Sequence, residues 1–307
     1  MKVIHDAREL QPGSRKVCVA IGFFDGVHLG HQQIVRQTVR DAKQHDGMAL
    51  VITFDQHPNT VVAPERVPPL IYSLPQKLKA IGELGADSLF LIHFDKEFSR
   101  QTGEEFIRDL AMDVKTLQSI CVGAEFVFGY KRGGDVNLLK RLGAELNFTV
   151  HGLSAVSLDG KVVSSTRIRE AIQAGDLDAA SQMLGRVYSL AGKVVRGDGL
   201  GRKLGFATAN IDFNGLAVPP KGVYAVHAEN AGGRWRAVLN IGLRPTLQNP
   251  NAKLQMEAHL LDFRGDLYEQ QLEITFLEKL REEKKFGSLA KLREQISKDI
   301  EEASSRF

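Results

Sequence analysis

Residues 22–31, Gly-Phe-Phe-Asp-Gly-Val-His-Leu-Gly-His, combine residue types and a spacing that suit phosphate chemistry. Glycines let the backbone approach a ligand closely. His28 and His31 are three residues apart, so they lie on one face of a helical turn. Two imidazoles at a helix N-terminus, where backbone N–H groups attract anions, could donate hydrogen bonds to phosphate oxygens as charge develops. A surface turn with incidental histidines is the weaker interpretation, because it does not account for the whole pattern.

A second candidate phosphate site is Ser164-Ser165-Thr166-Arg167-Ile168-Arg169, at the start of a helix predicted over 168–174. One hydroxyl is enough to cap a helix. Three hydroxyls followed by two arginines exceed that need, and arginine pairs strongly with phosphate. The segment therefore predicts a phosphate clamp, with simple N-capping as the structural alternative.

Alternating strands and helices would position these segments in the first half of the chain. Apolar runs predict strands at 17–23, 49–54, 88–93, 119–122 and 149–153. Helical spacing predicts helices over 34–42 and 74–84, after the capping box Thr102-Gly-Glu-Glu105, and from Asp135. This order indicates an α/β fold with a doubly wound parallel sheet, and such sheets bind ligands at the carboxyl ends of their strands.

From about Tyr188 the apolar period changes to two, which indicates antiparallel strands separated by Gly and Pro turns. A typical run places Leu254, Met256, Ala258 and Leu260 on one face. We expect an antiparallel β-barrel. It is followed by a terminal helix whose apolar face holds Leu289, Leu292, Ile296 and Ile300. This change in the period of apolar residues divides the chain into domains 1–185 and 186–307.

Length and composition fit two globular domains: 307 residues, 43% of them hydrophobic and 25% charged. The net charge, 40 − 37 = +3, is too small to indicate nucleic acid or an anionic membrane as a partner. The apolar stretch 17–24 is too short to cross a bilayer, and the N-terminus lacks a signal-peptide core. We expect a cytoplasmic protein with small-molecule partners, no nucleic-acid or membrane partner, and at most weak homo-oligomerisation. Cys18 and Cys121 lie in apolar runs and are expected to be buried free thiols.

The two phosphate motifs together resemble the adenylyltransferase module of bacterial FAD synthetases, the bifunctional riboflavin kinase/FMN adenylyltransferases. Other segments are similar to this family's T-F-x-x-H-P, V-G-x-D/N-F-x-F-G and I-S-S-T-x-x-R motifs. They are Thr53-Phe54-Asp-Gln-His57-Pro58, Val122-Gly123-Ala-Glu125-Phe126-Val-Phe128-Gly129 and Val163-Ser164-Ser165-Thr166-Arg167-Ile168-Arg169. Glu125 stands where the family has Asp or Asn, which puts the efficiency of adenylylation in question.

The second half resembles the family's kinase module, so the resemblance spans residues 15–303. Its segments are Gly197-Asp-Gly199-Leu-Gly201-Arg202-Lys203-Leu-Gly205-Phe206, Ala207-Thr208-Ala209-Asn210, Asn240-Ile-Gly242-Leu-Arg244-Pro245-Thr246, Met256-Glu257-Ala-His259-Leu260 and the tail at 280–286. Ala207 replaces the proline of the family's P-T-A-N signature, a change that removes no ligand.

For the first half, the resemblance implies a nucleotidyltransferase that joins FMN to the adenylyl group of ATP and releases pyrophosphate. It implies that His28 and His31 stabilise the transition state, and that Ser164, Thr166 and Arg169 clamp the triphosphate. The remaining implied contacts to nucleotide or flavin are Gly22, Phe24, Asp25, Gly26, His57 and Glu125.

For the second half, the resemblance implies phosphorylation of riboflavin by ATP. Glu257 is the implied general base, with His259 as the next candidate and a merely solvated carboxylate as the structural alternative. The resemblance implies that Thr208 and Asn210 bind Mg²⁺ and phosphate. It further implies that Gly199, Lys203 and Gly205 contact ATP, and that riboflavin, FMN and FAD are the flavin substrates and products.

Two rival functions account for less of the sequence. A different HxGH nucleotidyltransferase, acting on pantetheine phosphate or a sugar-alcohol phosphate, would leave Thr208, Asn210 and Glu257 without a role. An RNA-binding OB-like barrel should expose several aromatics among basic residues, and only Trp235 has that setting. The chain has no G-x-x-x-x-G-K-[ST] loop, and residues 197–205 do not match the dinucleotide motif.

Overall fold

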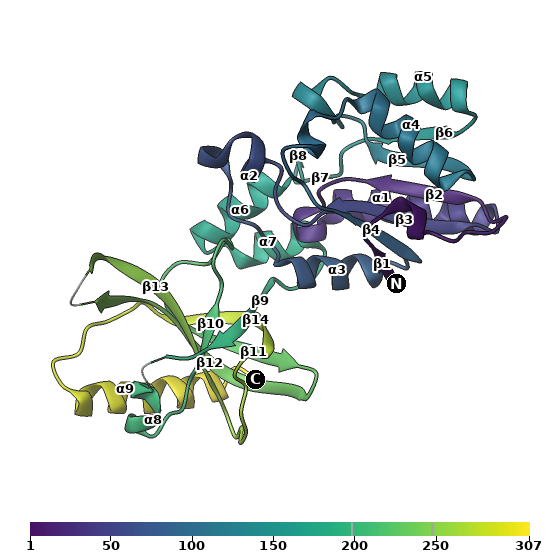
Figure 1. Ribbon diagram of the computed structural model, residues 1–307. Helices are drawn as coiled ribbons and strands as arrows, with labels where there is room; N and C mark the ends of the chain where they lie inside the picture. Colours follow the sequence, from purple (N-terminus) through teal and green to yellow (C-terminus); the bar gives the residue numbers. More distant parts are fainter. Residues whose placement is uncertain (198, 247–248) are drawn as a thin grey trace. The chain divides into compact units, whose positions relative to one another are not determined.

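The computed structural model describes the chain except Asp198, Leu247 and Gln248, with side chains also undescribed over 244–253. Its residues pack into two units (Figure 1). The first consists of Met1–Pro69 and Leu74–Ser165, and the second of Leu70–Ser73 and Thr166–Phe307.

The first unit is built on a six-stranded parallel sheet with the order β1-β4-β3-β2-β5-β6. The strands are β1 (Lys2–Ile4), β2 (Val17–Ile21), β3 (Met48–Phe54), β4 (Ser88–Ile92), β5 (Leu117–Gly123) and β6 (Thr149–Leu153). A two-stranded hairpin, β7 (Ser157–Leu158) and β8 (Lys161–Val162), follows. The sequence pattern missed β1, because three residues are too few to show a period.

Helices cover both faces of this sheet, as the doubly wound prediction requires. The helices of this unit are α1 (Leu29–Gln44), α2 (Asn59–Val62), α3 (Leu74–Gly82), α4 (Gly103–Val114) and α5 (Val136–Leu146). Ala42 of α1 packs with Cys18 on one face, while Ile107 of α4 and Leu142 of α5 pack with Val19 on the other. Because β2 is buried on both sides, its sequence is continuously apolar. Cys18 and Cys121 are buried free thiols, as predicted.

The second unit contains a closed antiparallel barrel with the order β10-β13-β12-β11-β14-β9. Its strands are β9 (Ser189–Val195), β10 (Ala209–Asp212), β11 (Gly222–Asn230), β12 (Gly233–Thr246), β13 (Asn249–Leu260) and β14 (Gln271–Arg281). The helices of this part are α6 (Ser165–Ala174), α7 (Leu177–Leu184), α8 (Leu200–Leu204) and α9 (Leu289–Ser304). The predicted barrel with a terminal helix is confirmed.

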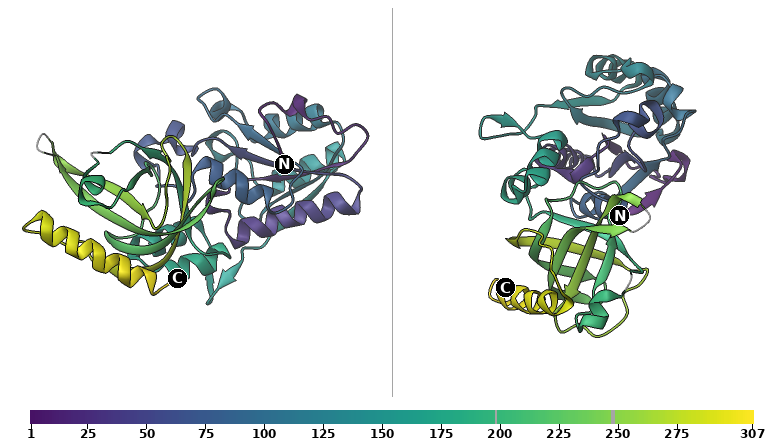
Figure 2. Two further views of the ribbon diagram at one scale, coloured as in Figure 1. Left: turned by 90° about the horizontal axis from the view of Figure 1, so that it is seen from below. Right: turned by 90° about the vertical axis from the view of Figure 1, so that its left-hand side faces the viewer.

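The terminal helix α9 lies along the outside of the barrel (Figure 2). Val223 and Ala225 of β11 pack with Ala303 and Ile300 of α9, while Tyr224 and Val226 are buried on the alternate positions. Both faces of β11 are therefore buried. Leu289, in contrast, is 61% exposed, so the packed face of α9 begins one turn later than predicted.

A short segment from the first half of the sequence packs within the second unit. The Leu70 N–H donates to the Gly215 carbonyl at 2.7 Å, and the Arg186 Nε donates to the Tyr72 hydroxyl at 2.8 Å. Ile71 is fully buried. Residues 166–185, which precede the predicted domain boundary, also belong to this unit. Packing alone therefore does not locate the boundary between the two activities.

No helix in the described part of the chain combines the length and the apolar character needed to cross a membrane.

A buried ion pair attaches α9 to the barrel. Arg281 donates from Nε and Nη2 to the two carboxylate oxygens of Asp299, each at 2.7 Å, and Gln295 donates to the same carboxylate at 2.9 Å. The side chains of Arg281 and Asp299 are only 14% and 3% exposed. Removing either partner would leave a poorly solvated charge.

Asp299→Ala is therefore expected to lower the free energy of unfolding by about 3 kcal/mol, measured by urea denaturation. The control is Glu294→Ala, which breaks the solvent-exposed Lys298–Glu294 pair on the same helix and should change stability little. Equal effects of the two substitutions would contradict a stabilising role for the buried pair.

Candidate active sites

The turn between β2 and α1 has an unusual backbone. Phe24, Gly26 and Val27 adopt left-handed φ values of 55°, 72° and 42°. Glycine tolerates this conformation, whereas the other two residues are strained by roughly 1–3 kcal/mol each. At Gly22, a Cβ atom would lie 2.8 Å from the Phe24 ring, so a larger residue would displace that ring. Strain of this kind is maintained where a site needs a particular geometry.

This turn places His28 at the N-cap of α1. Its Nδ1 accepts a long hydrogen bond, 3.4 Å, from the His31 backbone N–H. A neutral His28 ring that accepts at Nδ1 carries its proton on Nε2, which makes Nε2 a hydrogen-bond donor. Backbone N–H groups at the N-terminus of a 16-residue helix add a positive potential beside it.

The His28 and His31 rings stack with centroids 3.6 Å apart, and the edge of Phe24 meets His31 at 5.3 Å. Burial, followed by the charges of His28 and Lys77, holds the pKa of His31 well below its ordinary value. The His31 Nδ1 is buried and has no hydrogen-bond partner among the described residues. A buried ring nitrogen without a protein partner is a position for a ligand.

Two further predicted segments meet this turn within the first unit. The Ser165 hydroxyl donates to the Asp25 carbonyl at 3.1 Å, which ties Ser165 to the turn. The His57 ring meets the Phe23 ring edge-to-face at 4.8 Å, and its Nδ1 accepts from the Asn59 N–H at 3.0 Å. Ser165 is one of the three hydroxyls of the predicted clamp, although the resemblance assigned individual triphosphate contacts only to its neighbours Ser164 and Thr166.

The remaining predicted residues of this half differ in how exposed they are and in which of the two units they belong to. Phe24 and Asp25 are 1% and 3% exposed, whereas Glu125 is exposed beyond the carboxyl end of β5. Ser164 belongs to the first unit by packing, and Thr166 and Arg169 belong to the second.

Much of the motif around Glu125 serves packing. The Phe126 and Phe128 rings stack at 5.2 Å. A Cβ on Gly129 would lie 2.2 Å from the Gly103 nitrogen, and one on Gly134 would lie 2.9 Å from the Phe128 ring. These glycines are therefore required where the loop after β5 crosses the start of α4.

Sequence reasoning missed Lys77, a buried lysine at the same edge of the sheet. Its ammonium donates to the Phe54 carbonyl at 2.8 Å, and to the Phe23 carbonyl and the Thr53 hydroxyl at 3.3 Å each. Burial lowers the pKa of Lys77 to about 8. A single lysine in a helical pattern carries no signal that would distinguish it from a solvated one.

In the barrel, three polar residues form a row across neighbouring strands. Asn210 of β10 lies opposite Glu257 of β13, which lies opposite Asn240 of β12. Directly opposite residues project from the same face of a sheet. Met256 and Ala258 are buried on the other face. The Thr208 hydroxyl donates to the Glu257 carboxylate at 3.4 Å, so Thr208, Asn210 and Glu257 are brought together.

The glycine-rich loop passes close to this row. A Cβ on Gly197 would lie 2.2 Å from the Asn210 amide nitrogen, and one on Gly201 would lie 3.0 Å from the Thr208 hydroxyl oxygen. Gly199 and Gly205 instead have left-handed φ values of 68° and 93° and flank α8. The sequence analysis quoted all four glycines in one segment but assigned ATP contacts only to Gly199 and Gly205, because only the folded loop reveals what each glycine faces.

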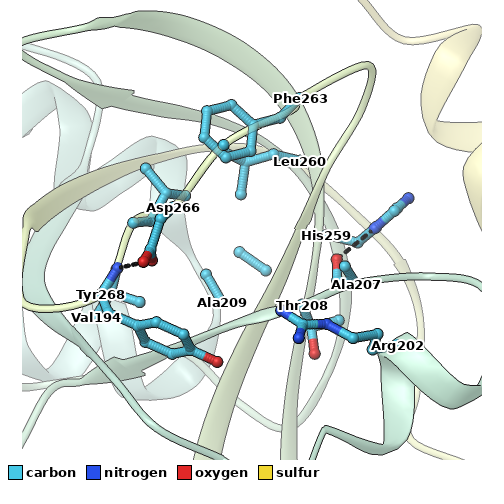
Figure 3. Close-up of a pocket in the computed structure, with 13 residues that line it drawn as sticks. Val194, Arg202, Ala207, Thr208, Ala209, His259, Leu260, Phe263, Asp266 and Tyr268 are labelled. Carbon is cyan, nitrogen blue, oxygen red and sulfur yellow. Dashed lines mark hydrogen bonds between the residues drawn. The ribbon is translucent and has the colours of Figure 1, made fainter.

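Two pockets adjoin at Arg202, Ala207, Thr208 and Tyr268. In Figure 3, Phe263 and Leu260 lie on one side of the first pocket, and Arg202 and Thr208 lie on the opposite side. The second pocket continues along Arg196, Gly197, Gly199 and Asn210. Such a cavity suits an elongated ligand with a ring system at one end and an anionic group at the other. Lys203 is exposed on α8 and does not line either pocket.

His259, the alternative base, makes a different hydrogen bond from that of Glu257. Its Nδ1 lies 2.7 Å from the Ala207 carbonyl, and because a carbonyl only accepts, Nδ1 donates. This bond fixes the residue before Thr208. Trp235, on which the RNA-binding alternative depended, packs edge-to-face against Phe263 at 5.0 Å.

The oxygen atoms of Glu257 and its neighbours are suitable ligands for a hard cation. Thr208 and Asn210 present a hydroxyl and an amide oxygen next to a carboxylate, and Mg²⁺ takes few protein oxygens together with phosphates and water. In the described residues, no three His, Cys, Asp or Glu side chains gather as a metal cluster.

Comparisons with known proteins match both halves of the chain. The FAD synthetase family matches residues 10–167, and the riboflavin kinase family matches residues 184–307. A bifunctional riboflavin kinase/FMN adenylyltransferase of Pseudomonas fluorescens is 38% identical over 300 residues, covering 98% of this chain and 96% of that protein. Its counterpart in Escherichia coli strain K12 is 35% identical over 301 residues, covering 97% and 96%.

A solved structure is also similar over nearly the full length. It is described as a crystal structure of a macrolide-efflux protein from Streptococcus pneumoniae, and it is 27% identical with a TM-score of 0.80. The match covers 97% of each chain, which supports the two-part fold.

Proposed function

The chain belongs to the family of bifunctional riboflavin kinase/FMN adenylyltransferases, and on that premise we propose which residues carry each reaction. The protein phosphorylates riboflavin to FMN with ATP, and it adenylylates FMN to FAD with release of pyrophosphate. The observation that carries this conclusion is that both family matches occur in order on one chain, each over the corresponding fold.

For adenylylation, an oxygen of the FMN phosphate attacks the α-phosphorus of ATP, and the bond to pyrophosphate breaks. The protein's task is to position the phosphates and to stabilise developing charge. His28 would donate from Nε2, and His31 would donate from Nδ1 in the tautomer that carries the proton there, beside the N-terminus of α1. Phe24 would hold His31 in place. The other proposed contacts are Ser164, Thr166 and Arg169 to the triphosphate, and Gly22, Asp25, Gly26, His57 and Glu125 to nucleotide or flavin.

For phosphorylation, Glu257 would take the proton of the riboflavin 5′-hydroxyl as that oxygen attacks the γ-phosphorus and ADP leaves. Thr208 and Asn210 would hold phosphate and Mg²⁺, and bound Mg²⁺ would neutralise charge on the ATP phosphates. Gly199 and Gly205 would shape the ATP loop, with Lys203 contributing positive charge. The pocket between Phe263 and Arg202 would accept the nucleotide.

We also propose that the protein acts in the cytoplasm on small molecules, without a nucleic-acid or membrane partner and with at most weak homo-oligomerisation.

The assay that tests the function is incubation of the purified protein with riboflavin, ATP and Mg²⁺, followed by chromatographic separation of the flavins. FMN should appear first and FAD after it. Starting from FMN should produce FAD alone. Folded protein that converts neither riboflavin nor FMN would refute the proposed function.

We propose that the functional boundary lies at 185/186, which fragments can test. Residues 1–185 are expected to adenylylate FMN, and residues 186–307 to phosphorylate riboflavin, because all six barrel strands follow Arg186. The second fragment lacks Leu70–Ser73, α6 and α7, so it should unfold at a lower temperature than the barrel in the full chain.

A fragment ending at Ser165 lacks Thr166 and Arg169 and should lose FMN adenylylation. If fragments 1–185 and 186–307 both give folded circular-dichroism spectra and neither is active, the proposed boundary is wrong.

A further inference from the structure

Lys77 joins the ends of the two strands that carry the adenylylation motifs. From α3, its ammonium bonds to the Phe23 carbonyl just beyond β2 and to the Phe54 carbonyl at the end of β3. The Thr53 hydroxyl, which accepts from Lys77, itself donates to the Phe23 carbonyl at 2.9 Å. One side chain therefore sets the spacing between the turn that leads to His28 and the loop that leads to His57.

The same ammonium orders the aromatic contact beside the site. It lies 4.4 Å from the centroid of the Phe23 ring, a cation–π distance, and that ring supports His57 edge-to-face. Displacement of Lys77 would release both the carbonyl and the ring of Phe23. His57 would lose the surface against which it packs.

Burial of an ammonium group costs desolvation free energy, and a purely structural contact does not require a charged group. Lys77 is 4% exposed, and its hydrogen-bond partners are all neutral oxygens. Burial disfavours its charge, while the charges of the Asp25 and Asp55 carboxylates favour it. Burying a charge is unfavourable unless hydrogen bonds compensate it, and a positive charge against a phosphate-binding turn favours an anionic ligand.

The charge of Lys77 also reaches His31. Burial, His28 and Lys77 together lower the pKa of His31, and a hydrogen bond with the Asp25 backbone opposes them. Removal of the Lys77 charge should therefore raise the pKa of His31. A purely steric support would not have this effect.

We propose that Lys77 is a positioning residue of FMN adenylylation, which holds the ends of β2 and β3 at the required spacing and keeps a fixed positive charge against the phosphate-binding turn. This inference rests on the proposed function of that site. Nothing in the sequence pattern distinguishes Lys77 from a solvated lysine; its role follows from the folded contacts alone.

The test compares full-length Lys77→Met, Lys77→Arg and a control, Lys140→Met, which changes an exposed lysine on α5. FAD formation from FMN and ATP gives kcat and KM. Riboflavin phosphorylation by the same chain reports whether the protein is folded. Titration of the His31 ring by NMR, assigned from the spectrum of His31→Gln, reports the electrostatic effect.

Lys77→Met should lower kcat for adenylylation by about 10²-fold, the effect typical of a displaced catalytic geometry, and leave riboflavin phosphorylation unchanged. It should also raise the pKa of His31. Lys77→Arg keeps the charge and should keep the pKa of His31 low. Its planar guanidinium cannot reproduce the three ammonium contacts, so its kcat should be intermediate. Lys140→Met should behave as the wild type.

A wild-type adenylylation rate in Lys77→Met, or an unchanged His31 titration, would overturn the inference. If Lys77→Met loses both activities, the rates of Lys77→Arg test the inference. Reduced adenylylation with normal kinase activity in Lys77→Arg supports it, and a wild-type adenylylation rate overturns it. A wild-type protein that forms no FAD would refute the proposed function instead, so the two failures are distinguishable.

Discussion

Glu257→Gln is expected to stop riboflavin phosphorylation while FMN supplied directly is still converted to FAD. The substitution keeps the side-chain size but removes the proton acceptor, and loss of a general base typically lowers the rate by about 10²–10⁴-fold. Glu257 accepts from the Thr208 hydroxyl and lies opposite Asn210, where Mg²⁺ and phosphate are proposed to bind. The measurement is the rate of FMN formation from riboflavin, with FAD formation from FMN assayed in parallel.

A matched control is Glu229→Gln, which changes an exposed glutamate on β11 of the same barrel and should leave both rates unchanged. General destabilisation would depress both activities of the Glu257 variant, so the difference between the two assays is the decisive result. If Glu257→Gln retains near-normal kinase turnover, Glu257 is a structural strand residue. His259 would then be tested next, although its Nδ1 is already bonded to the Ala207 carbonyl.

His28→Ala should show the opposite result: riboflavin is phosphorylated normally, and FMN accumulates with little FAD. Removing one preorganised donor to a transition state typically lowers the rate by about 10²–10³-fold. The change also removes the N-cap of α1, a loss that typically destabilises a helix by about 1 kcal/mol. Measured melting temperatures would show whether this smaller effect accounts for the lost activity.

His28→Asn separates the two roles, because asparagine caps a helix well but lacks the Nε2 donor. It should restore stability and not FAD formation. His45→Ala, at the exposed C-terminal end of α1, is the control and should leave FAD formation unchanged. Normal FAD formation by His28→Asn would mean that His28 acts only as a cap.

Local patterns predicted the architecture well, because they report burial directly. β2 is continuously apolar since both of its faces are covered, and the period of two in 254–260 follows from a barrel strand with one face inside. The capping box at Thr102 is present in the structure: Thr102 and Glu105 each accept from the other's backbone N–H. Strand ends in the first unit were accurate to about two residues, and the short strands β1, β7 and β8 gave no pattern.

The candidate site was predicted in part. Motif spacing pointed to His28 and His31, because they lie in a segment where residue type and spacing are unusual together, whereas Thr208, Asn210 and Glu257 followed from the resemblance to the family. The same reasoning passed over Lys77 and assigned no individual role to Ser165, Gly197 and Gly201 within their motifs. Each of these acts through a residue distant in sequence or through a close approach that appears only in the folded loop.

The sequence by itself determined the two fold classes, their order along the chain and the family, because periodicity and motifs are local properties. Only the tertiary structure decided which side chains meet. It placed the Lys77 ammonium between Phe23 and Phe54, and it packed Leu70–Ser73 with the barrel unit. It also buried the outer face of β11 under α9. These outcomes depend on burial and hydrogen bonding between segments far apart in the chain, where competing partners differ by small free energies that no local pattern encodes.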